Sequence, residues 1–198
     1  MSKLKIYGVP QSRASRALWA ARELGLDFEH VATHFAKDTN TPEFKQVNPN
    51  ARVPAIDDGG FKLFESMAIN LYLAKKYDKG QGLKPNSVEE DALATQWSFW
   101  VMTELEKPLV TMLLHNVNMR PCEPATYEQC EKDVRRPLQV LEEHLAGRPY
   151  LLGDRFTIAD LNVASVMMWA RGAKVDMAPY PKIADWLKRC ISRPAAKG

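Results

Sequence analysis

Three short stretches of this sequence carry residues suited to holding a small peptide-like ligand. The first is Arg52-Val53-Pro54, the second is Glu65-Ser66, and the third is Ser12. A backbone that can pair with a peptide, a pair that can grip an amino acid, and a hydroxyl that can face a sulfur would together form a binding site. Each stretch also has an ordinary structural interpretation, as part of a strand or as a helix cap.

Val53-Pro54 lies at the start of a predicted strand, where proline cannot donate a hydrogen bond to a neighbouring strand. If the bond before Pro54 were cis, the carbonyl and amide of Val53 would face a peptide ligand, which would bind as an extra strand. The alternative is an ordinary trans proline that begins a strand. The dipeptide alone does not decide between the two.

Glu65-Ser66 falls between a predicted strand and a predicted helix. A helix N-terminus has free amides and a partial positive charge, so it binds carboxylates, and the Ser66 hydroxyl adds a donor. Glu65 would pair with an ammonium group, and the pair would hold both charged groups of one amino acid. The alternative is a helix cap with an acidic neighbour.

Ser12 is expected in the turn between the first strand and the first helix. A hydroxyl there, beside free helix amides, can donate a hydrogen bond to a bound thiolate. A cysteine thiol with a pKa near 8.5 is only about 3% thiolate at pH 7, and lowering that pKa by two units takes about 2.7 kcal/mol. A charge-assisted hydrogen bond and a helix terminus can supply this. The alternative is a helix cap, and Ser15 competes for both roles.

The elements that must position these residues fall into two parts. Residues 1–78 predict a β-α-β, α, β-β-α order, with helices on both faces of a small mixed sheet, as in thioredoxin-like domains. Gly25 is expected to stop the first helix, and Asp58-Gly59-Gly60 indicates a hairpin. The expected strands are Leu4–Ile6, Phe28–Ala32, Val53–Asp57 and Phe61–Phe64, and the expected helices begin at Ser12, Thr41 and Ser66.

Residues 79–87 are rich in glycine, proline and polar residues and predict a linker. Residues 88–198 predict an all-helical domain. Thr157 and Asp160 have the spacing of a capping box, which gives Asp160 a structural role. The expected helices run from Glu89 to His115 with a bend or end at Pro108, from Thr126 to Leu145, from Thr157 to Arg171, and from Pro181 to Arg193.

Composition narrows the classes of function. Hydrophobic residues make up 45% of the 198-residue chain and charged residues 26%, which is typical of a folded globular protein. The net charge of +3 is scattered, which argues against nucleic acid but suits a small anionic ligand. No targeting or membrane-spanning segment is seen, and the three cysteines lack metal-ligand spacing. These features predict a cytoplasmic protein with no metal and no membrane association.

The three stretches, in this order and on these elements, resemble the glutathione transferase superfamily. Further motifs extend the resemblance over nearly the whole chain. They are Pro42-Glu43-Phe44, Asn48-Pro49-Asn50-Ala51, Ile69, Tyr72-Leu73, Tyr150–Asp154, Phe156–Leu161, and Tyr180-Pro181 through Trp186 to Ser192-Arg193-Pro194-Ala195. The resemblance implies a thioredoxin-like α/β N-terminal domain followed by an all-α C-terminal domain.

The resemblance also implies roles for the glutathione-binding residues. Pro54 should be cis, with the backbone of Val53 pairing with the cysteinyl unit of glutathione. Glu65 and Ser66 should hold the γ-glutamyl end, and Arg52 should approach the glycyl carboxylate.

For the thiolate, Ser12 resembles the catalytic serine of theta-like classes, found in bacteria among others. Tyr7 competes with it, because other classes use a tyrosine of the first strand. Many relatives have a basic residue where this chain reads Thr39-Asn40, so that contact would pass to Arg52 or Lys37.

The implied function is a glutathione transferase that activates the glutathione thiolate for attack on a small hydrophobic electrophile, acting as a homodimer in detoxification. Glutathione would be the cosubstrate. Two alternatives stay open: a glutathione-dependent peroxidase or reductase, and a non-catalytic glutathione transferase-like binding module. The absence of a cysteine near Ser12 argues against classes that form a mixed disulfide there.

Overall fold

The computed structural model describes residues 3–197, and the chain divides into two compact units between Lys84 and Pro85. The division falls inside the segment 79–87 that was predicted as a linker. The 3-10 helix η3 (Pro194–Lys197) belongs to the first unit, where it contacts the first helix. The second unit therefore ends at Arg193.

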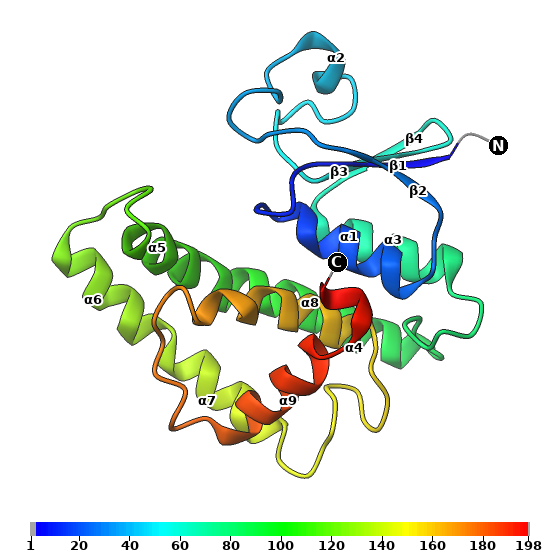
Figure 1. Ribbon diagram of the computed structural model, residues 1–198. Helices are drawn as coiled ribbons and strands as arrows, with labels where there is room; N and C mark the ends of the chain where they lie inside the picture. The colour runs from blue at the N-terminus through cyan, green and yellow to red at the C-terminus, as the bar shows by residue number, and fades with distance from the viewer. Residues whose placement is uncertain (1–2, 198) are drawn as a thin grey trace. The chain divides into compact units, whose positions relative to one another are not determined.

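The first unit is a four-stranded mixed sheet with helices on both faces (Figure 1). The strand order is β2-β1-β3-β4, with β1 parallel to β2 and antiparallel to β3, and β3 antiparallel to β4. Helices α1 and α3 lie on one face, and the short helix α2 lies on the other. This confirms the predicted thioredoxin-like arrangement. The elements are β1 Leu4–Tyr7, α1 Ala14–Glu23, β2 Phe28–Val31, α2 Pro42–Lys45, β3 Ala55–Asp58, β4 Phe61–Phe64 and α3 Ser66–Tyr77.

Buried and partly buried side chains alternate along β1, so they point to opposite faces of the sheet. Leu4 and Ile6 are buried, whereas Lys5 and Tyr7 are only partly buried and point to the opposite face. On α1 the predicted helical spacing buries a row of small residues, with Ala14, Ala17 and Ala21 each 0% exposed. Small side chains let α1 approach closely, and its main helical neighbour is α3.

Several boundaries in the first unit lie one or two residues from prediction, among them the start of α1 at Ala14 instead of Ser12. Strand β3 begins at Ala55 instead of Val53, because Pro54 has no amide hydrogen to donate to a ladder. Helix α3 begins at Ser66 itself, so Ser66 is the first helical residue and Glu65 takes the cap position. The other expected signals are confirmed. Thr41 accepts a hydrogen bond from the Phe44 amide at the start of α2, and Gly25 follows α1 with φ 63°.

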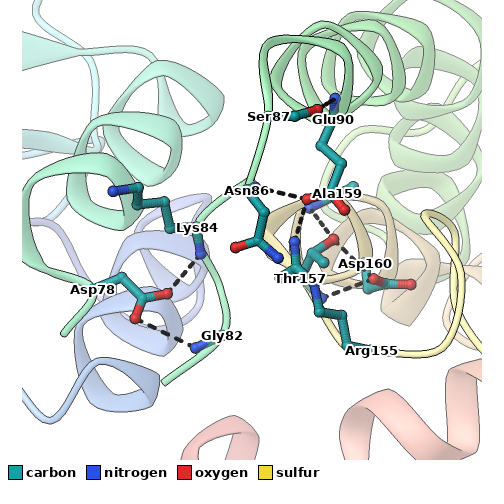
Figure 2. A network of polar contacts seen from close by, with 10 residues as sticks. All are labelled: Asp78, Gly82, Lys84, Asn86, Ser87, Glu90, Arg155, Thr157, Ala159 and Asp160. Carbon is teal, nitrogen blue, oxygen red and sulfur yellow. Dashed lines mark hydrogen bonds and ion pairs between the residues drawn. The ribbon is translucent and has the colours of Figure 1, made fainter. Parts of the chain in front are cut away.

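The second unit is all helical, as predicted. Helix α8 is its centre, since every residue of that helix is buried. Figure 2 shows the predicted capping box that begins α8. The Thr157 hydroxyl accepts from the amide of Ala159, and the Asp160 carboxylate accepts from the amide of Thr157. The elements are α4 Val88–Trp100, η1 Val101–Glu106, α5 Lys107–Asn116, α6 Pro124–Asp133, α7 Arg135–His144, α8 Ile158–Met167, η2 Met168–Ala170 and α9 Pro181–Ile191.

Two long predicted helices are interrupted, and proline explains both interruptions. The helix expected to bend or end at Pro108 continues to Asn116, but residues Val101–Glu106 adopt a π-helical pattern. The helix expected over Thr126–Leu145 begins earlier, at Pro124, and breaks at Val134. Proline cannot donate to the carbonyl four residues earlier and crowds it. That carbonyl belongs to Glu104 for Pro108, and Asp133 is the corresponding residue for Pro137.

Among residues 3–197, no helix is both long enough and apolar enough to cross a membrane.

Candidate functional site

The turn after β1 brings two of the predicted site residues together around Gly8. Gly8 has φ 133°, a conformation that side chains rarely adopt. A Cβ placed on Gly8 would lie 3.1 Å from the Cβ of Val53, 2.4 Å from the Cβ of Ala14 and 3.6 Å from the Oγ of Ser12. Ser12 and Val53 are therefore neighbours across a position that only glycine can fill.

Ser12 lies in the turn just before α1, as the sequence predicted, and is half-buried. Its hydroxyl donates to the carbonyl of Val9 over 2.7 Å and accepts from the amide of Ala14 over 3.1 Å. Ser15 lies one turn further on and donates to the carbonyl of Ser12. Ser12 can donate to a ligand by turning its O–H away from Val9, which exchanges one hydrogen bond for another.

Tyr7, the competing residue, is placed differently. Its ring packs edge-on against Phe44 of α2, with 5.9 Å between ring centroids, next to the buried Val47 and Ala55. Its neighbour Ile6 points to the opposite face of the sheet, toward α1. Burial raises the pKa of Tyr7 above its ordinary value, with the nearby Lys5 opposing this shift. The ring thus serves the small core beneath α2.

The segment before β3 is shaped by a buried asparagine that sequence reasoning missed. Asn48 is 2% exposed; its Nδ2 donates to the carbonyl of Arg52 over 2.6 Å, and its Oδ1 accepts from the amide of Asn50. The Val53-Pro54 bond is cis, as expected, and Pro54 is buried. An asparagine followed by proline, at a predicted helix end, was the available signal for this turn.

The start of α3 has the features of a carboxylate-binding end. Glu65 has φ 72° and ψ 114°, and the helix begins without a side-chain cap. Its first amides have no partner within the helix, and the helix dipole makes this end positive. Ser66 is only 3% exposed, while Glu65 is exposed and can meet a charged group of a ligand.

Arg16 is a second residue that sequence reasoning did not assign. It is 0% exposed, and its Nη1 donates to Ser66 Oγ over 3.2 Å. A buried guanidinium beside a helix N-terminus adds positive charge where a carboxylate would bind. The available signal was a charged residue inside the stretch Ala14–Ala21, which is otherwise largely apolar.

Helix α1 therefore links the predicted residues. Its leading turn places Ser12 beside Val53, and its first turn places Arg16 on Ser66. The side chains of Arg52 and Lys37 are exposed, and within residues 3–197 no contact brings either one to Ser12.

Thr39 and Asn40 lie where many relatives have a basic residue, and Thr39 has a structural role there. Thr39 is 1% exposed and donates to the carbonyl of Phe35, so its side chain holds a turn. Asn40 is exposed.

The arrangement suits a peptide-like ligand with a carboxylate, an ammonium group and a thiol. The α3 end and Arg16 attract a carboxylate, Glu65 attracts an ammonium group, and Ser12 can donate to a sulfur anion. In the described part of the chain, no group of three or more histidine, cysteine, aspartate or glutamate side chains is placed to hold a metal ion.

Comparison with known proteins gives two family matches. Residues 2–75 match the glutathione S-transferase N-terminal domain, and residues 102–194 match the glutathione S-transferase C-terminal domain. A glutathione S-transferase of Hyoscyamus muticus is 34% identical, covering 97% of this chain and 95% of that protein. A theta class glutathione S-transferase of Xanthomonas axonopodis pv. citri, solved with glutathione bound, superposes with a TM-score of 0.90. It is 27% identical, covering 100% of this chain and 96% of that chain.

The chain is also similar to a protein that is not named as a glutathione S-transferase. Elongation factor 1-gamma of Sus scrofa is 29% identical over 96% of this chain, which spans 45% of that longer protein.

Proposed function

The chain belongs to the glutathione S-transferase family, and from that premise we propose that Ser12 stabilises the thiolate of bound glutathione for attack on a small hydrophobic electrophile. The observation that carries the proposal is the pair of contacts made by α1. One places Ser12 beside Val53, and the other places Arg16 on Ser66. Glutathione is the cosubstrate, as the relatives solved with it indicate.

In the proposed complex each part of glutathione meets a different group. The γ-glutamyl carboxylate binds at the start of α3, near Ser66 and Arg16, and its ammonium group pairs with Glu65. The backbone of Val53 pairs with the cysteinyl unit as an added strand. Arg52 is exposed and next in sequence, and we assign it the glycyl carboxylate.

The chemical step is a substitution or addition by sulfur. The glutathione thiol loses its proton to solvent, Ser12 donates a hydrogen bond to the thiolate, and the sulfur forms a bond to the electrophilic carbon. In a substitution, the bond from that carbon to its leaving group breaks and the group departs with the electron pair. In an addition, the π bond breaks and the adjacent atom takes a proton from solvent. The protein forms no covalent bond. Its contribution is to raise the thiolate fraction and to hold the nucleophile in place.

Ser12 is favoured over Tyr7 by position. Ser12 borders Val53 across Gly8, whereas the ring of Tyr7 packs against Phe44 in the core beneath α2. A hydroxyl at the start of α1 also shares the positive end of that helix.

The test compares Ser12→Ala with Ser15→Ala, which removes a similar hydroxyl one turn away. We expect Ser12→Ala to lower the conjugation rate with a chloronitrobenzene substrate on the order of a hundredfold, because one donor to the reacting anion is lost. The pKa of bound glutathione should return toward about 8.5. Ser15→Ala should keep most of the rate. Unchanged rate and thiol pKa in Ser12→Ala would refute the assignment, and loss of both in Tyr7→Phe would favour Tyr7.

A second candidate function is a non-catalytic binding module, favoured by the similarity to elongation factor 1-gamma. Retention on glutathione-agarose, followed by assays with chloronitrobenzene and cumene hydroperoxide, separates the possibilities. Conjugation supports the transferase, and peroxide reduction alone supports the peroxidase alternative. Failure to bind glutathione supports the module.

The proposal includes a homodimer, the assembly that the family resemblance implies. Sedimentation equilibrium should give twice the chain mass of 22.4 kDa. A single-chain mass at all concentrations would contradict it.

A further inference from the structure

A cysteine and a histidine meet in the second unit, in a place that the proposed function does not use. Cys122 lies in the segment between α5 and α6, and His115 lies in the last turn of α5 (Figure 1). The Sγ of Cys122 is 3.5 Å from the Nδ1 of His115, and the amide of Cys122 donates to the same Nδ1 over 3.2 Å. Cys122 is partly exposed, so a reagent in solution can reach it.

The amide contact fixes the protonation of the imidazole. Because Nδ1 of His115 accepts from the Cys122 amide, its lone pair points toward Cys122, and in the neutral ring Nε2 carries the hydrogen. The Sγ of Cys122 lies 3.5 Å from the same Nδ1, so the thiol shares this lone pair with the amide and its proton can reach it. A thiol beside a correctly oriented imidazole is the arrangement that activates a cysteine nucleophile.

Further contacts hold the imidazole in this orientation. The ring of His115 packs at a tilt of 54° against the ring of Tyr127 of α6, with 4.9 Å between centroids. Asn116 donates to the Tyr127 hydroxyl and to the carbonyl of Gly172, each over 3.1 Å, so the tyrosine is fixed in turn. The pair has a nucleophile, a base and a group that orients the base.

The pair lies between two helix ends. His115 is in the last turn of α5, and Cys122 lies two residues before Pro124, the first residue of α6. The neighbouring residues Arg120 and Glu123 have charges of opposite sign.

The other two cysteines have the opposite character. Cys190 is 0% exposed and Cys130 is 8% exposed. Burial is the largest cause that raises the pKa of the Cys130 thiol, and the charges of Asp133 and Cys122 add to it. Both thiols are therefore protected, and they serve as internal controls within the same chain.

We propose that Cys122, with His115 as its proton acceptor, is a thiol that exchanges with small disulfides such as glutathione disulfide. The thiol proton passes to Nδ1 of His115, and the Sγ of Cys122 attacks one sulfur of the disulfide. A new S–S bond forms at Cys122, the original S–S bond breaks, and the departing thiolate takes the proton from the imidazolium. Cys122 is oxidised, the departing half is reduced, and excess thiol reverses the exchange. This site does not depend on the proposed function of the first unit.

The test is to incubate the reduced protein with glutathione disulfide at neutral pH and to follow the intact mass. We expect one glutathionyl adduct per chain, located by peptide mapping at Cys122 and removed by dithiothreitol. Cys122→Ser should form no adduct and should bind glutathione-agarose as before. An adduct at Cys130 or Cys190 in the folded protein, or none at all, would overturn the proposal.

The histidine is tested with His115→Asn, whose amide oxygen can still accept from the Cys122 amide but is not basic. We expect the exchange rate to fall at least about tenfold, as for loss of a general base. His34→Asn is the matched control, because Nδ1 of His34 also accepts a backbone amide, from Ala36. It should leave the rate unchanged, and an unchanged rate in His115→Asn would remove the histidine from the proposal.

A second measurement covers a His115→Asn variant that does not fold. In the wild-type protein the Cys122 thiol should exchange with the same disulfide faster at neutral pH than the free thiol of glutathione does, because His115 accepts its proton. A rate no faster than that of the free thiol would overturn the proposal.

Discussion

At the scale of single residues, the absence of a side chain at Gly8 positions the candidate site. Ser12, Ala14 and Val53 all approach the place that a Cβ would occupy. Gly8 therefore sets the distance between the hydroxyl proposed to face sulfur and the backbone proposed to bind the cysteinyl unit.

Gly8→Ala tests this role against Gly80→Ala. Both glycines have a positive φ, 133° and 113°, so both substitutions strain the backbone, at a cost of about 1 kcal/mol. Only the new Cβ at Gly8 would meet other atoms, at 2.4 Å from Ala14 Cβ, whereas nothing lies within 4 Å at Gly80. We expect Gly8→Ala to lose on the order of 3 kcal/mol of unfolding free energy and to bind glutathione poorly.

The measurements are urea unfolding and retention on glutathione-agarose. Equal losses of unfolding free energy in Gly8→Ala and Gly80→Ala would show that the close approach at Gly8 does not affect stability.

At the scale of elements, a polar network ties the β3–β4 hairpin to α3. Asp58 ends β3, and its carboxylate accepts from the Tyr72 hydroxyl over 2.6 Å, from Lys76 Nζ over 2.6 Å and from the Tyr77 hydroxyl over 2.7 Å. Burial by itself would raise the pKa of Asp58, but these three donors outweigh it and hold the pKa below its ordinary value. The same contacts raise the pKa of Lys76. The hairpin that follows the cis proline is thereby fixed to the helix that begins at Ser66.

This network makes stability depend on pH. A carboxyl whose pKa is lower in the folded chain stabilises the fold above its unfolded pKa of about 3.9, and this contribution is lost as the pH falls through the folded pKa. We expect Asp58→Asn to lose on the order of 2 kcal/mol at neutral pH, because it replaces a charged acceptor of three hydrogen bonds. The difference from wild type should shrink below about pH 4.

Urea unfolding at several pH values provides the measurement. Asp57→Asn is the control, because Asp57 is the adjacent aspartate and accepts one amide, from Gly60. Asp57→Asn should lose less unfolding free energy at neutral pH than Asp58→Asn does. A difference between Asp58→Asn and wild type that grows as the pH falls would contradict the sign derived from the pKa.

At the scale of the whole molecule, one aspartate organises the chain where the first unit ends. Asp78 follows α3, and its carboxylate accepts from four backbone amides. Figure 2 shows the contacts with the amides of Gly82 and Lys84, and the amide of Gly80 is the third. The amide of Gln81 is the fourth. Burial would raise the pKa of Asp78, but these amides lower it. The segment predicted as a linker is thus a structured turn up to Lys84.

Asp78→Ala should open this turn. With four amides left without their acceptor, local opening becomes easier, and we expect trypsin to cleave after Lys79 roughly tenfold faster. Asp176→Ala is the control, since Asp176 accepts only one amide, from Ala178. Limited proteolysis of the folded variants measures the rate. The same cleavage rate in wild type and Asp78→Ala would show that other contacts hold the segment.

Much of the fold was readable from local signals. Thr41, Gly25 and the Thr157–Asp160 pair act within one turn, so their spacing alone indicated where helices begin and end. The change of helix type before Pro108 was not readable, because a proline can end, bend or locally unwind a helix, and the surrounding packing decides which.

The candidate site was readable only in part, for a related physical reason. The motifs identified Ser12, Val53 and Ser66, but the contact between Arg16 and Ser66 joins residues 50 positions apart. The order of strands around Gly8 creates the other close approach. Contacts of this kind depend on how the elements pack, which local spacing does not specify.

The π-helical segment η1 has a consequence for the rest of its helix. A π turn closes its hydrogen bonds over five residues instead of four, so it holds an extra residue and shifts the angular phase of everything that follows. One residue corresponds to about 100° of rotation in an α-helix. Val101–Glu106 therefore set the direction in which α5 presents His115. Deleting a single residue there would rotate α5, and His115 with it, by about 100° relative to α4.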